Sequence, residues 1–272
     1  MLRNPDLVST SIHRSLVTRI RRTHQLQGIA VFIGPPGIGK STSLDAMREE
    51  EPYAFNVIVT PHGGEKGVSP RVALQLAIEG MERMTESRRA GDRIPTDLLE
   101  LRSRLFAVMA EWAGVSASEA RRDGLDRRLF APLTFAFDEA QNLSRDALEM
   151  LRELNEARAG FSPLPVGLVL LGNDEFALKA GRGRQSIVSA AFANRARYFE
   201  TLTYEHVTDE DLRLLFEARG IDDEAALDLI LRHLRAGRRD RSFRRAGYLA
   251  DDLQTEADGK PVTAATVKAV LF

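Results

Sequence analysis

The sequence predicts an α/β fold, in which helices flank a parallel β-sheet and a small all-helical domain follows. Two observations lead to this prediction. Short apolar runs, typical of buried parallel strands, alternate with segments of helical periodicity up to about residue 204. Beyond that point only helical patterns follow. We therefore divide the 272 residues into a leader helix (1–28), an α/β domain (29–204) and a helical lid domain (205–272).

Five apolar runs are expected to form the strands of the sheet. They cover residues 29–33, 57–59, 133–137, 166–171 and 198–202. Their β-branched and aromatic content favours strands that are covered on both faces. The carboxyl ends of such strands lie at one edge of a parallel sheet, where ligands bind.

Helical spacing predicts the elements that connect the strands. The helices are expected over residues 5–27, 40–50, 70–81 and 98–112, after Ser144, and from Thr208 onwards. Ser144, Thr96 and Thr208 stand where helix caps are expected. Three acidic residues follow Thr208, which suits the first turn of a helix.

The composition excludes several classes of protein. The chain has no cysteine, which excludes disulfides, thiolate catalysis and cysteine-based metal sites. The longest apolar stretch, residues 166–171, is too short to span a bilayer, and residues 1–6 lack a signal pattern, so we expect a cytoplasmic protein without a membrane partner. A net charge of −1 means that contact with nucleic acid would need a local basic patch.

A glycine-rich turn follows the first strand and matches the pattern G-x-x-x-x-G-K-[ST] at every position. Its glycines let backbone N–H groups approach phosphate, and the next helix directs its positive end to the same place. We expect Lys40 to reach the β- and γ-phosphates and the Ser41 hydroxyl to bind magnesium. The sequence therefore predicts binding of ATP with Mg²⁺. The residues expected to contact the nucleotide are Gly34, Pro35, Pro36, Gly37, Ile38, Gly39, Lys40, Ser41 and Thr42.

Two acids end the third strand. Asp138 is expected to hold magnesium through water, and Glu139 to act as the general base that polarises the attacking water. An Asp-Glu pair is common on protein surfaces. Here the pair ends a buried strand, and it follows the glycine-rich turn of residues 34–41, a pattern known as a P-loop. We therefore predict ATP hydrolysis.

The sequence Asp138-Glu139-Ala140-Gln141 resembles the DEAQ form of the second Walker motif. That form is found in AAA+ ATPases of the MuB, TnsC and TniB type, which regulate DNA transposition, and in ExeA-like relatives. The resemblance covers about residues 27–250. It implies an AAA+ nucleotide-binding domain, assembly of identical subunits into a ring or filament, and duplex DNA and a transposase or integrase as partners. Only about thirty residues precede the P-loop, so the chain looks more like the compact TnsC and TniB members than like MuB.

Further residues match the AAA+ pattern. Asn173 resembles the sensor-one residue, and Arg195, with Arg197 as second candidate, resembles the arginine finger that reaches the ATP of a neighbouring subunit. Arg244 is similar to the sensor-two arginine, although Arg241 stands where glycine is usual. The alternatives are a turn cap for Asn173, ordinary surface charges for Arg195 and Arg197, and a solvated helix face for Arg244.

Several basic segments are candidates for contact with DNA phosphates. By resemblance, the loop 63–67 with Lys66 would face the channel of a ring and follow a DNA backbone. Arg88 and Arg89 form a second set, and Arg238 and Arg239 belong to a third. The third set could instead form a charged helix face or pair with the acids of residues 222–224 in another subunit. Because aromatic residues do not alternate with these charges, duplex DNA is the better match.

Three other functions remain open at this point. An ExeA-like assembly ATPase would use the same motifs without touching DNA. A helicase loader would share the DNA-related setting. A P-loop kinase for a small molecule would need a pocket for its phosphate acceptor and no arginine from a second subunit.

Overall fold

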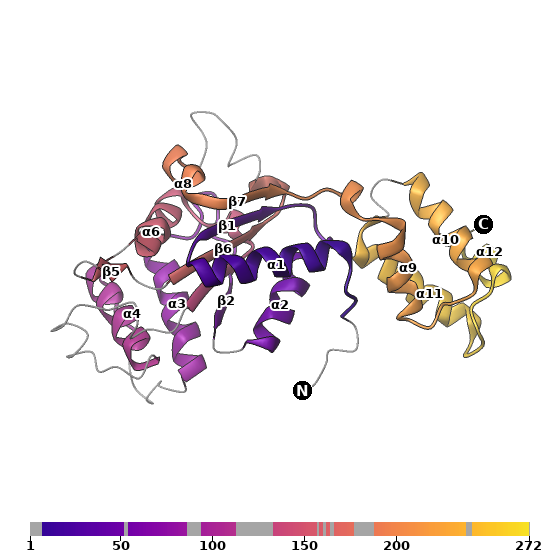
Figure 1. Cartoon of the computed structure of the whole chain (residues 1–272), viewed down its shortest axis with the longest axis horizontal. Helices are drawn as coiled ribbons and strands as arrows, with labels where there is room; N and C mark the ends of the chain where they lie inside the picture. The colour runs from indigo at the N-terminus through magenta and orange to yellow at the C-terminus, as the bar shows by residue number, and fades with distance from the viewer. Residues whose placement is uncertain are drawn as a thin grey trace. The chain divides into compact units, whose positions relative to one another are not determined.

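The computed structural model describes residues 7–51, 54–85, 94–112, 133–156, 158–159, 162–163, 166–176, 188–237 and 241–271 (Figure 1). The chain forms two compact units. We call residues 18–33 and 44–201 the α/β unit, and residues 1–17, 34–43 and 202–272 the P-loop unit. The N-terminal residues and the P-loop thus group with the C-terminal helices. The predicted division at residues 28 and 204 stays a prediction.

The α/β unit contains the predicted parallel sheet, with five strands in the order β2-β3-β6-β1-β7 (Figure 1). The strands are β1 (Ile29–Ile33), β2 (Phe55–Val59), β3 (Leu133–Asp138), β6 (Val166–Gly172) and β7 (Ala196–Thr201). Each corresponds to one predicted apolar run, and β1 matches its run at both ends. This sheet, with its flanking helices and the helical C-terminal part, confirms the predicted fold class.

The burial of a strand depends on whether it lies in the centre or at the edge of the sheet. Every residue of β1 and β6 is buried, because strands lie on both sides of each and helices cover both faces. The edge strand β7 alternates between partly buried and exposed residues. In the register, Ile33 lies opposite Gly172, and Phe137 lies opposite Leu170. The carboxyl ends of β1, β3 and β6 therefore lie at one edge.

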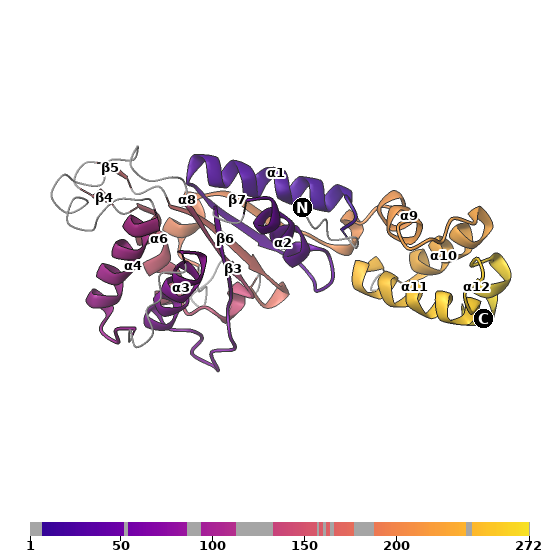
Figure 2. The same ribbon diagram turned by 90° about the horizontal axis from the view of Figure 1, so that it is seen from below.

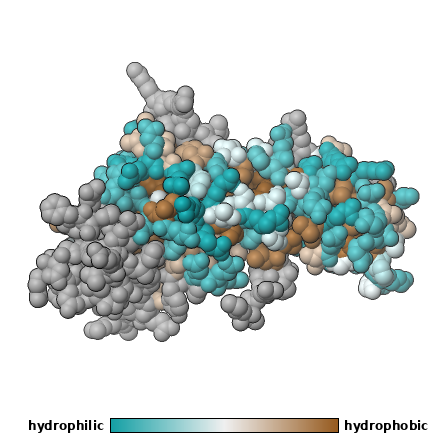
Figure 3. Space-filling model, in the orientation of Figure 1, coloured by the Kyte–Doolittle hydropathy of each residue, from teal (hydrophilic) through white to brown (hydrophobic). Residues whose placement is uncertain are grey.

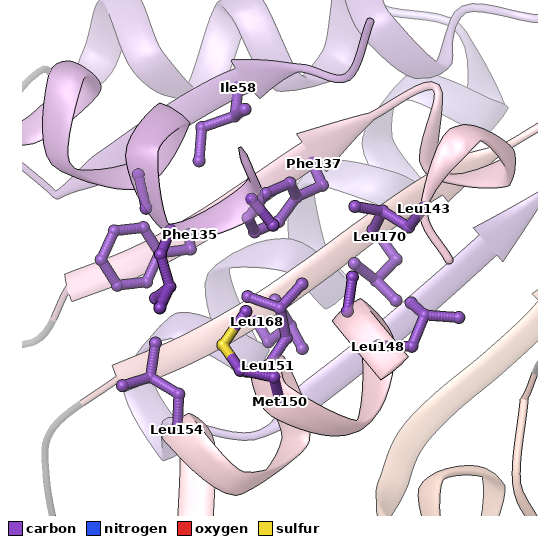
Figure 4. Packing of buried hydrophobic residues seen from close by; sticks show 14 of the residues in the cluster. Ile58, Phe135, Phe137, Leu143, Leu148, Met150, Leu151, Leu154, Leu168 and Leu170 are labelled. Carbon is purple, nitrogen blue, oxygen red and sulfur yellow. The ribbon is translucent and has the colours of Figure 1, made fainter. Parts of the chain in front are cut away.

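Helices cover both faces of the sheet. Figure 2 shows α1 (Ser11–Leu26) and α2 (Lys40–Glu50) on one face, and α3 (Pro70–Thr85), α4 (Leu98–Trp112) and α6 (Arg145–Glu156) on the other. Between α6 and the sheet, Leu148, Leu151 and Leu154 pack with residues of β3 and β6 (Figure 4). The labelled residues of β3 and β6 are Phe135, Phe137, Leu168 and Leu170. The helix α8 (Ala190–Arg195) and a small antiparallel pair, β4 (Arg158–Ala159) and β5 (Ser162–Pro163), were not predicted.

Two of the three predicted caps are confirmed. The Ser144 hydroxyl accepts the N–H of Ala147 at 3.2 Å, and Thr208 accepts the N–H of Asp211 at 3.0 Å. The prediction for Thr96 is wrong. Asp97 directly precedes α4, and its carboxylate accepts the N–H groups of Leu99 and Glu100 at 2.9 and 3.2 Å, respectively. Thr96 stands one residue too early for the cap position.

The C-terminal part of the P-loop unit is a cluster of four helices in the described residues. They are α9 (Asp209–Glu217), α10 (Glu224–Ala236), α11 (Phe243–Ala257) and α12 (Ala264–Leu271), preceded by the 3-10 turn η2 (Tyr204–His206). The apolar residues of these helices form a buried core, which includes Leu212 and Phe216 of α9, Leu227 and Ile230 of α10, and Leu253 of α11. Because the apolar residues face this core, the surface over these helices is mostly hydrophilic on the side drawn in Figure 3.

A buried carboxylate joins the N-terminal residues to α9. Asp211 is 1% exposed, and its two oxygens accept the backbone N–H and the hydroxyl of Ser11 at 2.5 and 2.6 Å. Burial alone would raise the pKa of Asp211, but hydrogen bonds from Ser11 and Thr208 outweigh burial and hold that pKa below its usual range. The first turn of α1 is thereby fixed within the P-loop unit.

Candidate nucleotide site

The P-loop, residues 34–41, needs glycine where its chain turns. Gly37 and Gly39 have φ angles of +75° and +93°, which side chains rarely adopt. A Cβ atom on Gly37 would also come within 2.8 Å of the Cβ of Arg244. Both the turn and the close approach of Arg244 therefore depend on Gly37.

Lys40 opens α2 and folds back over this loop. Its ammonium donates to the carbonyl oxygens of Gly34 and Pro35 at 2.6 and 3.0 Å. The N–H groups of the first turn of a helix have no intrahelical acceptor, and the P-loop leads directly into the first turn of α2. An ammonium beside the amino end of a helix fits a polyphosphate, so the residues present suit the expected nucleotide.

A pocket of about 290 Å³ lies beside the P-loop. Val8, Leu215 and Phe243 supply apolar walls, and Thr10, His13 and Ser43 supply polar groups. The imidazole Nδ1 of His13 lies 3.1 Å from the Ser43 hydroxyl. Apolar walls with a few polar groups are typical of small-molecule sites, and this pocket has a size that suits a base with its sugar.

Arg244 is exposed on the first turn of α11 and lines the same pocket. The structure thus brings it to the P-loop, as the sensor-two resemblance implies, while its contact with nucleotide stays a prediction. Arg241, which replaces the usual glycine, has a structural role. Its guanidinium donates to the carbonyl of Val207 at 2.6 Å and to Asp209 at 3.0 Å, and so fixes the start of α9.

Tyr204 is a P-loop contact that sequence reasoning missed. Its hydroxyl donates to the carbonyl oxygen of Pro36 at 3.0 Å. The two residues lie 168 positions apart, and Tyr204 belongs to no motif. No signal in the sequence could have paired them.

The predicted hydrolytic acids lie at the carboxyl edge of the sheet in the α/β unit. Asp138 ends β3, and its carboxylate accepts the backbone N–H of Glu139 at 2.9 Å. Glu139 is exposed and has left-handed backbone angles, with φ 55° and ψ 40°. Such angles are unfavourable for a residue with a side chain and concentrate at functional sites. This geometry agrees with the role predicted for Glu139, which stays a prediction.

Asn173 follows β6 at the same edge. Its side-chain oxygen accepts the N–H of Glu175 at 2.9 Å, so the turn-cap alternative is correct for this oxygen. Its backbone N–H donates to the side-chain oxygen of Gln141 at 3.2 Å. A sensor-one role would therefore rest on the amide nitrogen of the Asn173 side chain.

The two arginine-finger candidates lie on either side of the junction between α8 and β7. Arg195 ends α8, is 59% exposed, and has its Nε atom 3.4 Å from a carboxylate oxygen of Glu156. Arg197 lies within β7, not before it as expected, and its guanidinium is 5.9 Å from the ring centroid of Tyr198. Both side chains have the exposure that contact with a second subunit would require.

Of the predicted DNA contacts, only Lys66 can be located. It is exposed in the loop 63–67. Arg88, Arg89, Arg238 and Arg239 lie outside the described residues.

A family model described as an AAA domain matches residues 21–179, more than half of the chain. The chain belongs to the AAA domain family. It is therefore a P-loop AAA+ ATPase, a class that binds nucleotide, usually with Mg²⁺. The match covers β1, the P-loop, β3 and β6.

Solved structures agree with this fold. The RuvB Holliday junction branch migration motor of Thermotoga maritima is 13% identical, with a TM-score of 0.53 over 97% of this chain and 69% of that chain. Cdc6p of Pyrobaculum aerophilum is 16% identical, with a TM-score of 0.55 over 93% of this chain and 64% of that chain. At these identities the likeness shows the fold alone. No curated protein sequence matches the chain. Within the described residues, every helix is too short or too polar to cross a bilayer.

Proposed function

We propose that this AAA+ ATPase binds duplex DNA in an ATP-dependent manner and regulates DNA transposition. It would assemble on DNA as a ring or filament with ATP, recruit a transposase or integrase, and disassemble on hydrolysis. The DEAQ sequence at the end of β3 supports the transposition part of this proposal. One structural neighbour, RuvB, is a Holliday junction branch migration motor, which supports the DNA part of this proposal.

Each predicted site residue has its own role in the proposed hydrolysis. The P-loop amides and Lys40 would bind the phosphates, and Mg²⁺ would be held by the Ser41 hydroxyl and, through water, by Asp138. ATP supplies the γ-phosphoryl group that is transferred to water. Glu139 accepts the proton of that water, and Arg195 of a neighbouring subunit stabilises the charge that develops.

The attachment of the Lys66 loop to the segment that follows Glu139 supports a link between DNA contact and ATP hydrolysis. The N–H of Val68 donates to the carbonyl of Asn142 at 2.7 Å, and the N–H of Ser144 donates to the carbonyl of Val68 at 3.0 Å. Val68 and Leu143 form a parallel bridge. Val68, which directly follows the loop 63–67, is therefore held by backbone hydrogen bonds to residues 142–144, which begin three positions after Glu139.

The position of Gly67 makes this attachment tight. Gly67 has a φ angle of +71°, and a Cβ atom there would lie 2.9 Å from the nitrogen of Ser144. The side-chain amide of Asn142 also donates to the carbonyl of Thr60 at 3.0 Å, at the end of β2. Two routes thus join the end of β2 and its following loop to the segment after Glu139. We expect DNA on this loop to stimulate hydrolysis.

A gel-shift assay tests the proposal. With ATP and Mg²⁺ at low salt, the protein should retard duplex DNA, and Lys66→Ala should weaken that binding. Lys260→Ala is the matched control, because Lys260 is also exposed but lies after α11 in the C-terminal part. Removal of a phosphate-contacting lysine should also reduce the salt dependence of binding.

An unshifted duplex in the presence of ATP would contradict the proposal. If ATP turnover were intact in that case, an AAA+ machine without a DNA role, such as an ExeA-like assembly ATPase, would be the better assignment. Co-purification with a replicative helicase would instead favour a helicase loader.

A further inference from the structure

Gln141, the last residue of the DEAQ sequence, contacts two of the predicted catalytic residues. It is 5% exposed and lies in the 3-10 turn η1 (Ala140–Asn142). Its side-chain nitrogen donates a hydrogen bond to a carboxylate oxygen of Glu139. Its side-chain oxygen accepts the backbone N–H of Asn173 at 3.2 Å. One buried amide therefore joins the proposed general base to the proposed sensor residue.

Chemistry fixes the orientation of this amide. An ionised carboxylate can only accept hydrogen bonds, and a backbone N–H can only donate. If the amide were reversed, its oxygen would face the carboxylate of Glu139 and its nitrogen would face the N–H of Asn173. Both contacts would then be repulsive, so the amide nitrogen must face Glu139.

The same amide links two neighbouring strands. Glu139 follows β3 and Asn173 follows β6, and these strands pair directly in the sheet. Glu139 has an exposed side chain on a left-handed backbone, so the sheet alone does not fix its carboxylate. The buried amide of Gln141, which also bonds to Asn173 after the neighbouring strand, holds the Glu139 carboxylate in place. It bonds to one of the two carboxylate oxygens.

We infer that Gln141 is a positioning residue for ATP hydrolysis, which holds the Glu139 carboxylate in a fixed relation to Asn173. This inference rests on the proposed role of Glu139 as general base. Gln141 touches neither nucleotide nor water in this role. It acts through Glu139, so its loss should lower kcat and leave the affinity for ATP unchanged.

The test compares steady-state ATP hydrolysis and the binding of a fluorescent ATP analogue in the full chain. Gln141→Met keeps a similar length but loses both hydrogen bonds. We expect its kcat to fall roughly ten- to a hundredfold, the range for one lost hydrogen bond to a charged group, with KM close to that of the wild type. Gln75→Met is the matched control, because the Gln75 amide donates to the carbonyl of Pro95 at 3.3 Å in the same unit, and its kcat should be unchanged.

A second variant separates the two hydrogen bonds. Gln141→Glu keeps an oxygen that can accept from Asn173 but places a second carboxylate against Glu139. Its kcat should fall at least as far as that of Gln141→Met, because two like charges then oppose each other at short range. All rates are expressed per nucleotide-binding site, as counted by titration, so that a fraction of unfolded protein does not lower kcat.

Wild-type kcat per site in Gln141→Met, beside an inactive Glu139→Gln variant, would overturn this inference and leave the proposed hydrolysis intact. A loss of activity that disappears once rates are expressed per binding site would also overturn it, because Gln141 would then serve folding alone. Normal turnover in Glu139→Gln would instead overturn the catalytic role of Glu139 itself.

Discussion

The hydroxyl of Tyr204 donates a hydrogen bond to the carbonyl oxygen of Pro36, and so ties the start of the C-terminal part to the P-loop. Tyr204→Phe removes only this hydroxyl. A neutral hydrogen bond contributes about 0.5–1.5 kcal/mol, so the Kd for ATP should rise roughly two- to tenfold. Titration with a fluorescent ATP analogue measures the change. Tyr248→Phe is the control, since Tyr248 is 62% exposed on α11, and a matching rise in that variant would contradict a specific role for Tyr204.

Two glycines of the Lys66 loop allow a test of its link to the hydrolytic segment. Gly64 and Gly67 both have positive φ angles, +66° and +71°, so alanine strains the backbone at either position. Only at Gly67 would the new Cβ meet the 142–144 segment, whereas at Gly64 nothing lies within 4 Å. We expect Gly67→Ala to lose DNA-stimulated ATP turnover and Gly64→Ala to retain it. Equal stimulation in the two variants would show that the attachment transmits nothing.

A mixing experiment tests whether active sites are shared between subunits. Arg195→Ala alone should lose about a thousandfold or more in turnover if Arg195 is an arginine finger. Lys40→Ala alone should lose nucleotide binding. Mixed together, the two variants form some sites with an intact Lys40 and a neighbouring Arg195, so part of the activity should return. Without recovery of activity in the mixture, the model of active sites shared between subunits fails.

His24 should make the stability of the α/β unit depend on pH. Burial lowers the pKa of His24, with a smaller opposing effect from Glu51, and its Nδ1 atom lies 3.0 Å from the Thr134 hydroxyl. The folded state therefore binds this proton less readily than the unfolded state, where the pKa is about 6.5. Stability should be full above that value and should fall as the pH drops below it.

Denaturant unfolding at pH 7.5 and 5.5 measures this effect. The carboxylates whose pKa values are lowered, such as Asp209 and Asp211, lose their contribution only at more acidic pH, below the usual carboxylate range. The change in unfolding free energy between pH 7.5 and 5.5 therefore reports on histidine. The difference in unfolding free energy between the two pH values should shrink in His24→Gln, and an undiminished difference would assign the effect to other groups.

Sequence patterns within single short segments were sufficient to predict much of the fold. The strands β1 and β6 could be predicted because buried parallel strands leave unbroken apolar runs, and the P-loop could be predicted because its glycines stand at fixed spacing. The short elements α8 and β4 could not, since six and two residues are too few to show a period. The cap at Asp97 was misplaced by one residue because threonine and aspartate both cap helices.

Long-range contacts account for what the sequence did not reveal about the site. The pairing of Tyr204 with Pro36, and of Gln141 with Asn173, depends on tertiary structure and leaves no periodic trace. The same holds for Val8, Thr10 and His13, whose place beside the P-loop follows from the fold of the N-terminal residues. The spacing of the motifs predicted which residues belong to the site and the role of each. The contacts that support these residues could be identified only in the structure.

Glu139→Gln is the most direct test of the account, because the variant keeps the shape of the side chain and removes its ability to accept a proton. ATP turnover and ATP binding should be measured on the same preparation. We predict that binding stays at the wild-type level while turnover is abolished, which would also trap the assembled state on DNA. Wild-type turnover in Glu139→Gln would contradict the assignment of the hydrolytic site.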